Sequence, residues 1–299
     1  MKNLLWICGV ICILLSGCNF SLLQTPTPQT STIAVSQVPA LTLEQLQNCS
    51  YLAPQYNHVT QLKDGKYETS SGVGIFSAFL QPEVAFGDLN GDGMEDAAVL
   101  LAENGGGTGV FVSLIAVLNE NGSPMQTATV FIEDRPIINS LTISAGKILL
   151  DATLHGPNDP MSNPTEKVSE TYQLPGIGLT NLVLIHFISK TPDGSERSIT
   201  INSPKKGNQV SRSIQVVGSM PIGPFENTVT YRIYDESGNN LAEGPFMVNS
   251  DGAGGPASFD APIDISALPQ GIPIRLELVD FSMADGSTLA LDSVELVIP

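Results

Sequence analysis

Nine consecutive residues, Asp88-Leu89-Asn90-Gly91-Asp92-Gly93-Met94-Glu95-Asp96, have the most specific chemical pattern in this sequence. Side-chain oxygens stand at the first, third, fifth and ninth positions, and a glycine at the sixth permits a sharp turn. This spacing lets a loop wrap oxygen ligands around Ca²⁺. It predicts a structural calcium ion held by the side chains of Asp88, Asn90, Asp92 and Asp96 and by the backbone carbonyl of Met94.

The loop resembles the calcium loops of dockerins and of integrin-type propeller blades, with one departure. Val99 stands at the twelfth position, where an EF-hand has a bidentate Glu. The predicted site is therefore weak, in the range that suits extracellular calcium. The alternative is that residues 90–93 form only a hairpin corner with the acids in solvent, because turns and ion loops use the same residue types.

Patterns that indicate catalysis are few. His155 and Asp159 flank a Gly-Pro-Asn segment and could act as a base and its orienting carboxylate. No serine elbow, metalloprotease helix or phosphate loop accompanies them, so a turn is the favoured role. We expect no enzymatic activity. The alternative is a hydrolase acting on an envelope polymer, with a carboxylate pair brought together by the fold of the first domain.

The N-terminus carries a targeting signal. Lys2 precedes an apolar run from Leu4 to Leu15, which is too short for a comfortable membrane span. The segment Leu15-Ser16-Gly17-Cys18 resembles the signal of bacterial lipoproteins. That resemblance implies that residues 1–17 are removed as a signal peptide and that Cys18 carries the lipid. Several acyl chains anchor a protein stably, so we expect an extracytoplasmic protein tethered to the cell membrane or envelope. The alternative is an ordinary signal peptide or an uncleaved anchor.

The other cysteines indicate neither a disulfide nor a reactive thiol. Cys8 and Cys12 lie in the leader and Cys18 is assigned to lipid, so Cys49 has no partner for an intramolecular disulfide. His58 is near in sequence, but no catalytic motif surrounds either residue. A buried or inert Cys49 is favoured over a reactive one.

The charge balance excludes some partners. The sequence has 30 Asp and Glu against 13 Lys and Arg, for a formal net charge of −17. A chain this acidic, with no basic stripe, is a poor nucleic-acid binder. The acids are spread along the sequence, which favours solubility or cation affinity over a docking tail. An envelope protein or polysaccharide remains as the possible partner.

The remaining sequence predicts a spacer and two domains. Residues 18–40 are rich in Thr, Pro, Ser and Gln and predict a flexible spacer. Residues 41–190 predict an α+β domain, in which Thr42 caps one short helix and an antiparallel sheet follows. Asp64-Gly65 predicts a hairpin of residues 59–62 and 67–68. Further strands are expected at residues 97–102, 110–119, 127–133, 140–144, 147–154, 167–174 and 181–189.

The polar segment 190–195 marks the predicted domain boundary. Residues 191–299 contain about seven strand-like runs separated by turn signals, which predicts an all-β immunoglobulin-like sandwich. The strands are expected at residues 198–202, 213–217, 228–235, 241–248, 257–265, 272–281 and 288–298.

Each predicted domain resembles a known group of bacterial proteins. Residues 199–204, 214–218, 234–238 and 281–287 resemble the immunoglobulin-like domain of bacterial spore-germination and related surface lipoproteins. That resemblance implies an accessory, non-catalytic domain at the cell envelope, and it does not imply a role in germination. The first domain more loosely resembles small secreted bacterial proteins of unknown function, through the segments 64–67, 87–93, 96–99 and 155–160. Cysteines often follow the last of these segments in that group, whereas this chain has Ser162-Asn163, and the resemblance implies no activity.

Overall fold

The computed structural model describes residues 38–69, 75–250, 252 and 254–299. The predicted leader, the lipid-bearing Cys18 and nearly all of the predicted spacer lie outside these residues. No helix in the described part is long and apolar enough to span a membrane. Residues 38–299 form one compact unit.

Strands dominate the described residues. A two-stranded sheet contains β1 (Ser50–Ala53) and β2 (His58–Gln61). A five-stranded sheet has the order β3 (Lys66–Thr69), β4 (Phe76–Gly87), β5 (Asp96–Asn104), β6 (Phe111–Glu120) and β7 (Ser123–Asp134). A four-stranded sheet has the order β13 (Thr200–Ser203), β14 (Ser213–Met220), β18 (Ala257–Asp264) and β17 (Asn249–Ser250).

A nine-stranded sheet contains strands from both predicted domains. Its order is β16 (Asn240–Met247), β15 (Thr228–Asp235), β19 (Ile272–Phe281), β20 (Thr288–Ile298), β11 (Val183–Lys190), β10 (Glu166–Gln173), β9 (Lys147–Leu154) and β8 (Ile137–Ser144), with β12 (Glu196–Arg197) paired to β11. The short 3₁₀ turn η1 (Phe225–Asn227) precedes β15.

The one α-helix within residues 38–69 and 75–299 that the structure describes, α1 (Leu43–Gln47), begins as the sequence predicts. Thr42 caps it, and a capping box joins Thr42 to Gln45. Leu46 is fully buried against the five-stranded sheet. The described residues are thus mostly strand, and the α+β description of the first domain rests on one five-residue helix.

Strand β5 shows why the five-stranded sheet is buried on both faces. Successive side chains of a strand point to opposite faces. Ala98, Leu100 and Ala102 lie in the core shared with the nine-stranded sheet. Ala97, Val99 and Leu101 lie in the core beneath α1, β1 and β2. A nearly continuous apolar run is therefore needed here, since neither face meets water.

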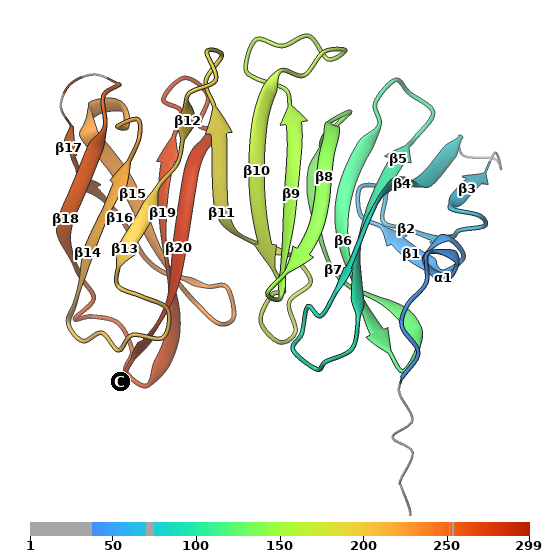
Figure 1. The fold of residues 1–299 in the computed structure, drawn as a ribbon, viewed down its shortest axis with the longest axis horizontal. Coiled ribbons are helices and arrows are strands. Elements are labelled where there is room, and N and C mark those ends of the chain that lie inside the picture. The colour runs from blue at the N-terminus through green and yellow to red at the C-terminus, as the bar shows by residue number, and fades with distance from the viewer. Residues whose placement is uncertain (1–37, 70–74, 251, 253) are drawn as a thin grey trace, which may run out of the picture. The chain divides into compact units, whose positions relative to one another are not determined.

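The nine-stranded sheet uses opposite faces in its two halves. On β19, Leu276 and Leu278 pack into the core formed with the four-stranded sheet. The next residue, Val279, packs into the core formed with the five-stranded sheet, as does Leu291 of β20. The two halves join where β11 pairs with β20 over three residues (Figure 1). The domain boundary at residue 190 stays a prediction, and one sheet connects strands from either side of it.

The C-terminal half confirms the predicted β-sandwich. Strands β15, β16, β19 and β20 pack on the four-stranded sheet, and apolar side chains of both sheets alternate inward. Ile214 and Val216 of β14 are fully buried opposite Leu276. Burying each such side chain stabilises the fold by about 1.5–3 kcal/mol.

Candidate functional site

The acidic loop between β4 and β5 is held by its own backbone. The Asp88 carboxylate accepts hydrogen bonds from the N–H of Gly91 at 2.6 Å and of Gly93 at 2.9 Å. Both glycines have φ of 81°, a conformation that glycine adopts at little cost. Any other residue at either position would be strained, which explains the Asn-Gly-Asp-Gly sequence.

The middle of the loop continues this pattern. Asn90 Oδ1 accepts from the N–H of Asp92 at 2.9 Å, and Asp92 Oδ1 accepts from the N–H of Met94 at 2.7 Å. The Asn90 amide also donates to Asp92 Oδ2 at 2.8 Å. These are the local side-chain bonds that Asn and Asp make in turns. The loop therefore keeps its shape through protein atoms.

Asp96 occupies a different environment from the rest of the loop. Its side chain is fully buried. Oδ2 accepts from the N–H of Leu89 at 2.8 Å, and Oδ1 accepts from the N–H of Asn119 at 2.9 Å. Asp96 thus ties the start of the loop to the end of β6, a structural role that the loop motif alone does not reveal.

These contacts bear on the predicted calcium ion. Among the residues that the structure describes, no three His, Cys, Asp or Glu side chains gather in a way that could hold a metal ion. Asp88, Asn90 and Asp92 share the exposed loop, whereas Asp96 lies beneath it. Calcium binding at Asp88–Asp96 stays a prediction. Most of the ligands would have to come from the exposed loop, from Asp88, Asn90 and Asp92.

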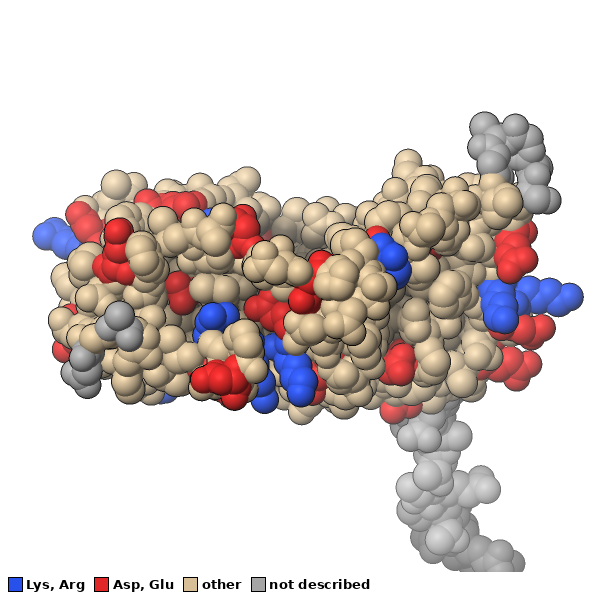
Figure 2. Space-filling view, turned by 90° about the horizontal axis from the view of Figure 1, so that it is seen from above, with Lys and Arg blue, Asp and Glu red and all other residues tan. Residues whose placement is uncertain are grey.

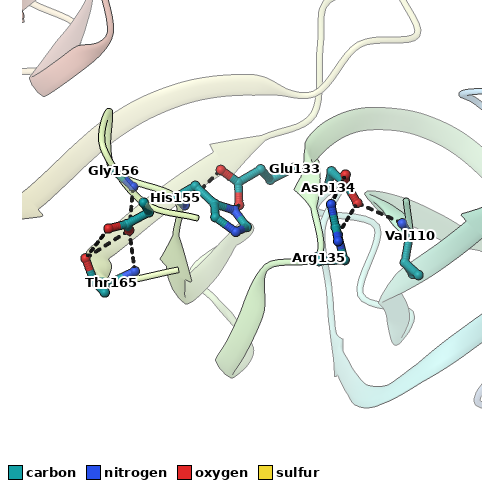
Figure 3. A network of polar contacts seen from close by, with 8 residues as sticks. Val110, Glu133, Asp134, Arg135, His155, Gly156 and Thr165 are labelled. Atoms are coloured by element: carbon teal, nitrogen blue, oxygen red, sulfur yellow. Dashed lines mark hydrogen bonds and ion pairs between the residues drawn. The ribbon is translucent and has the colours of Figure 1, made fainter. Parts of the chain in front are cut away.

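The loop at His155 does not form the pair considered from the sequence. His155 Nδ1 lies 2.8 Å from Glu133 Oε2, and its backbone N–H donates to Glu133 Oε1 at 2.9 Å (Figure 3). Asp159 instead accepts from the N–H of Gly156 and from Thr165. The Gly156 bond, followed by the Thr165 bonds, lowers the pKa of Asp159. The favoured reading of this segment as a turn agrees with these contacts.

Two buried carboxyls were not predicted from the sequence. Glu170 on β10 is 7% exposed and accepts a 3.0 Å hydrogen bond from Tyr172 Oη. Burial raises the pKa of Glu170 to about 7, and burial likewise raises that of Asp280 on β19 to about 6. Shifted carboxyls are found at many catalytic sites. Here both are covered by protein, so a substrate could not reach them in this conformation.

Cys49 is a half-buried free thiol. Burial raises its pKa, which reduces the thiolate fraction. His58 does not lie beside it as an activating base would, because the His58 ring packs against Tyr67 and Phe76. Both observations fit the predicted inert cysteine.

A group of rings from four segments lies at the surface of the five-stranded sheet. We call Tyr56, Phe76, Phe111 and Phe131 the aromatic cluster. The Tyr56 ring is 5.2 Å from that of Phe76 and 6.2 Å from that of Phe111, and Phe111 is 6.3 Å from Phe131. Tyr56 is 41% exposed and Phe131 is 44% exposed. The sequence gives no hint of this cluster, because the rings are far apart along the chain.

A buried carboxylate positions the ring of Tyr56. Glu103 on β5 is fully buried and accepts from the N–H groups of Gln55 and Tyr56. Burial raises the pKa of Glu103. A Cβ at Gly105 would lie 2.6 Å from Tyr56 Oη, so only glycine lets the ring rest there. The cluster is thus supported by the sheet rather than left to side-chain motion.

The surface charge agrees with the sequence. Figure 2 shows acidic side chains scattered over the visible face rather than gathered in one block. This scattered arrangement of Asp and Glu side chains fits the expectation that the acidic residues are spread over the protein.

Comparison with known proteins covers only the C-terminal half. Residues 198–287 match the immunoglobulin-like domain of bacterial spore germination. The match ends immediately before β20, the strand that pairs with β11. It agrees with the expected immunoglobulin-like domain, whereas the resemblance expected for residues 41–190 stays a prediction. No curated protein and no solved structure matches the chain.

Proposed function

We propose that this chain is an extracytoplasmic envelope protein, anchored by lipid on Cys18, that acts by binding and not by catalysis. The observation that carries the proposal is the aromatic cluster, with Tyr56 and Phe131 both more than two fifths exposed. Exposed apolar surface that the fold holds in place is typical of an interaction site. Aromatic rings are also enriched among the residues that contribute most to binding.

The C-terminal domain supports an accessory role. Residues 198–287 match a domain type described for bacterial spore germination, which points to the bacterial envelope but to no particular ligand. The sandwich shares a sheet with the first domain. This shared sheet would fix the position of the aromatic cluster relative to the sandwich. A role in germination forms no part of the proposal.

The binding role is testable by co-sedimentation with isolated bacterial envelopes. The full chain should carry Cys18→Ala, so that lipid does not drive the sedimentation. We expect Tyr56→Ser with Phe131→Ser to weaken envelope binding at least tenfold. Phe225→Ser is the matched control, since Phe225 is 64% exposed on the sandwich. Equal binding by the double variant and the parent would refute the role of the cluster.

The lipid anchor requires a separate experiment. The full chain expressed in a bacterium should partition into the detergent phase, and Cys18→Ala should partition into the aqueous phase. A few acyl chains suffice for stable anchoring, so the contrast should be nearly complete. Unchanged partitioning of the variant would refute lipidation at Cys18.

A hydrolase is the alternative, and one observation favours it: a Glu170 pKa near 7 suits a general acid. The burial of Glu170 argues against it. Loss of polymer cleavage in Glu170→Gln, with normal folding, would establish the alternative.

A further inference from the structure

The nine-stranded sheet has a polar groove on the face that the five-stranded sheet leaves open. The groove has a volume of about 210 Å³ and lies over β8 to β11. Its lining includes Asn139, Asp151, Lys167, Ser169, Ile188 and Lys190. The neighbouring residues Ala152 and Val168 point into the apolar core on the other side of the sheet. The groove is therefore formed by side chains that alternate with core residues.

The strand register aligns these side chains in two rows. Ser140, Asp151, Ser169 and Ile188 are successive partners across β8, β9, β10 and β11. Neighbouring strands are about 4.8 Å apart, so the row crosses the sheet at regular steps. The next row contains Lys167 and Lys190. Val168 is the register partner of Ser189, Lys167 comes directly before Val168, and Lys190 comes directly after Ser189.

Asp151 provides hydrogen-bond acceptors in the groove. Its Oδ2 accepts from Ser140 Oγ at 2.8 Å, and its Oδ1 accepts from Ser169 Oγ at 2.6 Å. These two hydroxyls fix the carboxylate in one orientation. Each carboxylate oxygen can accept a second hydrogen bond, so Asp151 can still bind ligand hydroxyls.

The two lysines provide positive charge and form no salt bridge with the described residues. Neither Lys167 nor Lys190 takes part in any of the ion pairs formed within the described ranges. Glu196 is the register partner of Lys190, but its carboxylate accepts from Ser198 Oγ at 3.1 Å. In a chain with a net charge of −17, the lining of this groove holds two ammonium groups and one carboxylate, that of Asp151. Such charge complementarity selects anionic ligands.

We propose that this groove binds an acidic polysaccharide. Carboxylate or phosphate groups of the polymer contact Lys167 and Lys190, and its hydroxyls contact Asp151 and Ser169. The inference rests on the proposed binding role at the envelope. It assigns a ligand class to the groove, which is a different surface from the aromatic cluster.

Calorimetric titration of the full chain with Cys18→Ala tests the groove. The probes are polygalacturonate for carboxylate and poly(glycerol phosphate) for phosphate, with methyl-esterified polygalacturonate as the neutral polymer. We expect at least one anionic polymer to bind and the neutral polymer not to bind. Lys167→Gln with Lys190→Gln should weaken binding at least tenfold. Lys63→Gln with Lys205→Gln removes the same charge from exposed sites elsewhere and should change binding less than threefold.

The outcomes separate this inference from the proposed function. Equal losses in both lysine pairs would show general charge attraction and overturn the groove. Absence of binding to both anionic polymers, or equal binding of the neutral one, would also overturn it. In either case the aromatic cluster could still mediate envelope binding, which the Tyr56 and Phe131 variants report independently.

Discussion

Asp292 on β20 contacts His186 on β11, with Oδ1 3.2 Å from the imidazole Nδ1. Its other oxygen accepts from the N–H of Ile201 on β13 at 2.8 Å. One carboxylate therefore links a strand of the first predicted domain to both sheets of the sandwich. Ser293 Oγ adds a 2.8 Å hydrogen bond to the carbonyl of Ile185 at the same junction.

Removing this carboxylate should destabilise the junction. We expect Asp292→Ala to lower the free energy of unfolding by about 2–3 kcal/mol, because the N–H of Ile201 loses its acceptor in a part-buried site. Urea denaturation measures the change. Asp260→Ala, on the exposed surface of β18, should stay within about 0.5 kcal/mol of the parent. Equal stability of the two variants would contradict a structural role for Asp292.

Asp96 should matter more for folding than the exposed acids of its loop. Asp96→Ala leaves the N–H groups of Leu89 and Asn119 without acceptors in a buried site. We expect a loss of about 2–4 kcal/mol in the free energy of unfolding, measured in chelator. Asp92→Ala removes two hydrogen bonds from an exposed loop and should cost about 1 kcal/mol or less. The reverse order would show that Asp96 does not anchor the loop.

Calcium should stabilise the protein weakly if the exposed loop binds it. With about 10 mM calcium and a Kd of about 1 mM, typical of extracellular sites, the gain is about 1.4 kcal/mol. We expect thermal unfolding to show a higher midpoint in calcium than in chelator for the parent and no difference for Asp92→Ala. Magnesium at the same concentration controls for ionic strength. A calcium response retained by Asp92→Ala would place the ion elsewhere.

Most strands could be predicted because their side-chain patterns are local. The alternation of Ile274, Leu276 and Leu278 identifies β19, and Thr42 with Gln45 identifies the start of α1. Strand β4, whose 12 residues contain Pro82, was not predicted from the sequence. Proline within an apolar run argues against a strand. Here the register shifts between Leu80 and Val84, so the irregularity accommodates the proline.

Strand pairing was harder to predict than strand position. The turn at Asp64-Gly65 exists, with φ of 51° and 79°. The predicted hairpin around it is limited to one antiparallel bridge between Lys63 and Lys66, since β2 pairs with β1 and β3 pairs with β4. The β11–β20 junction and the aromatic cluster bring together residues that are distant in the sequence. A local sequence pattern carries no information about such long-range contacts.

Glu170 should make stability depend on pH in a defined window. Its pKa rises from an ordinary 4.5 to about 7 in the folded protein because of burial. Between these values the folded state holds a proton that the unfolded chain has released, so stability falls as pH rises. The loss from this group is about 3 kcal/mol across the window. Asp280, with a pKa raised to about 6, contributes with the same sign.

Glu170→Gln should remove most of that dependence. The amide carries no charge, and its oxygen can still accept from Tyr172 Oη. We expect urea denaturation from pH 4.5 to 8 to show a shallower decline for the variant than for the parent, with the variant the more stable above pH 7. Glu68→Gln, at an exposed position on β3, should follow the parent. Parallel curves for Glu170→Gln and the parent would mean that Glu170 ionises in the folded state as easily as in the unfolded chain.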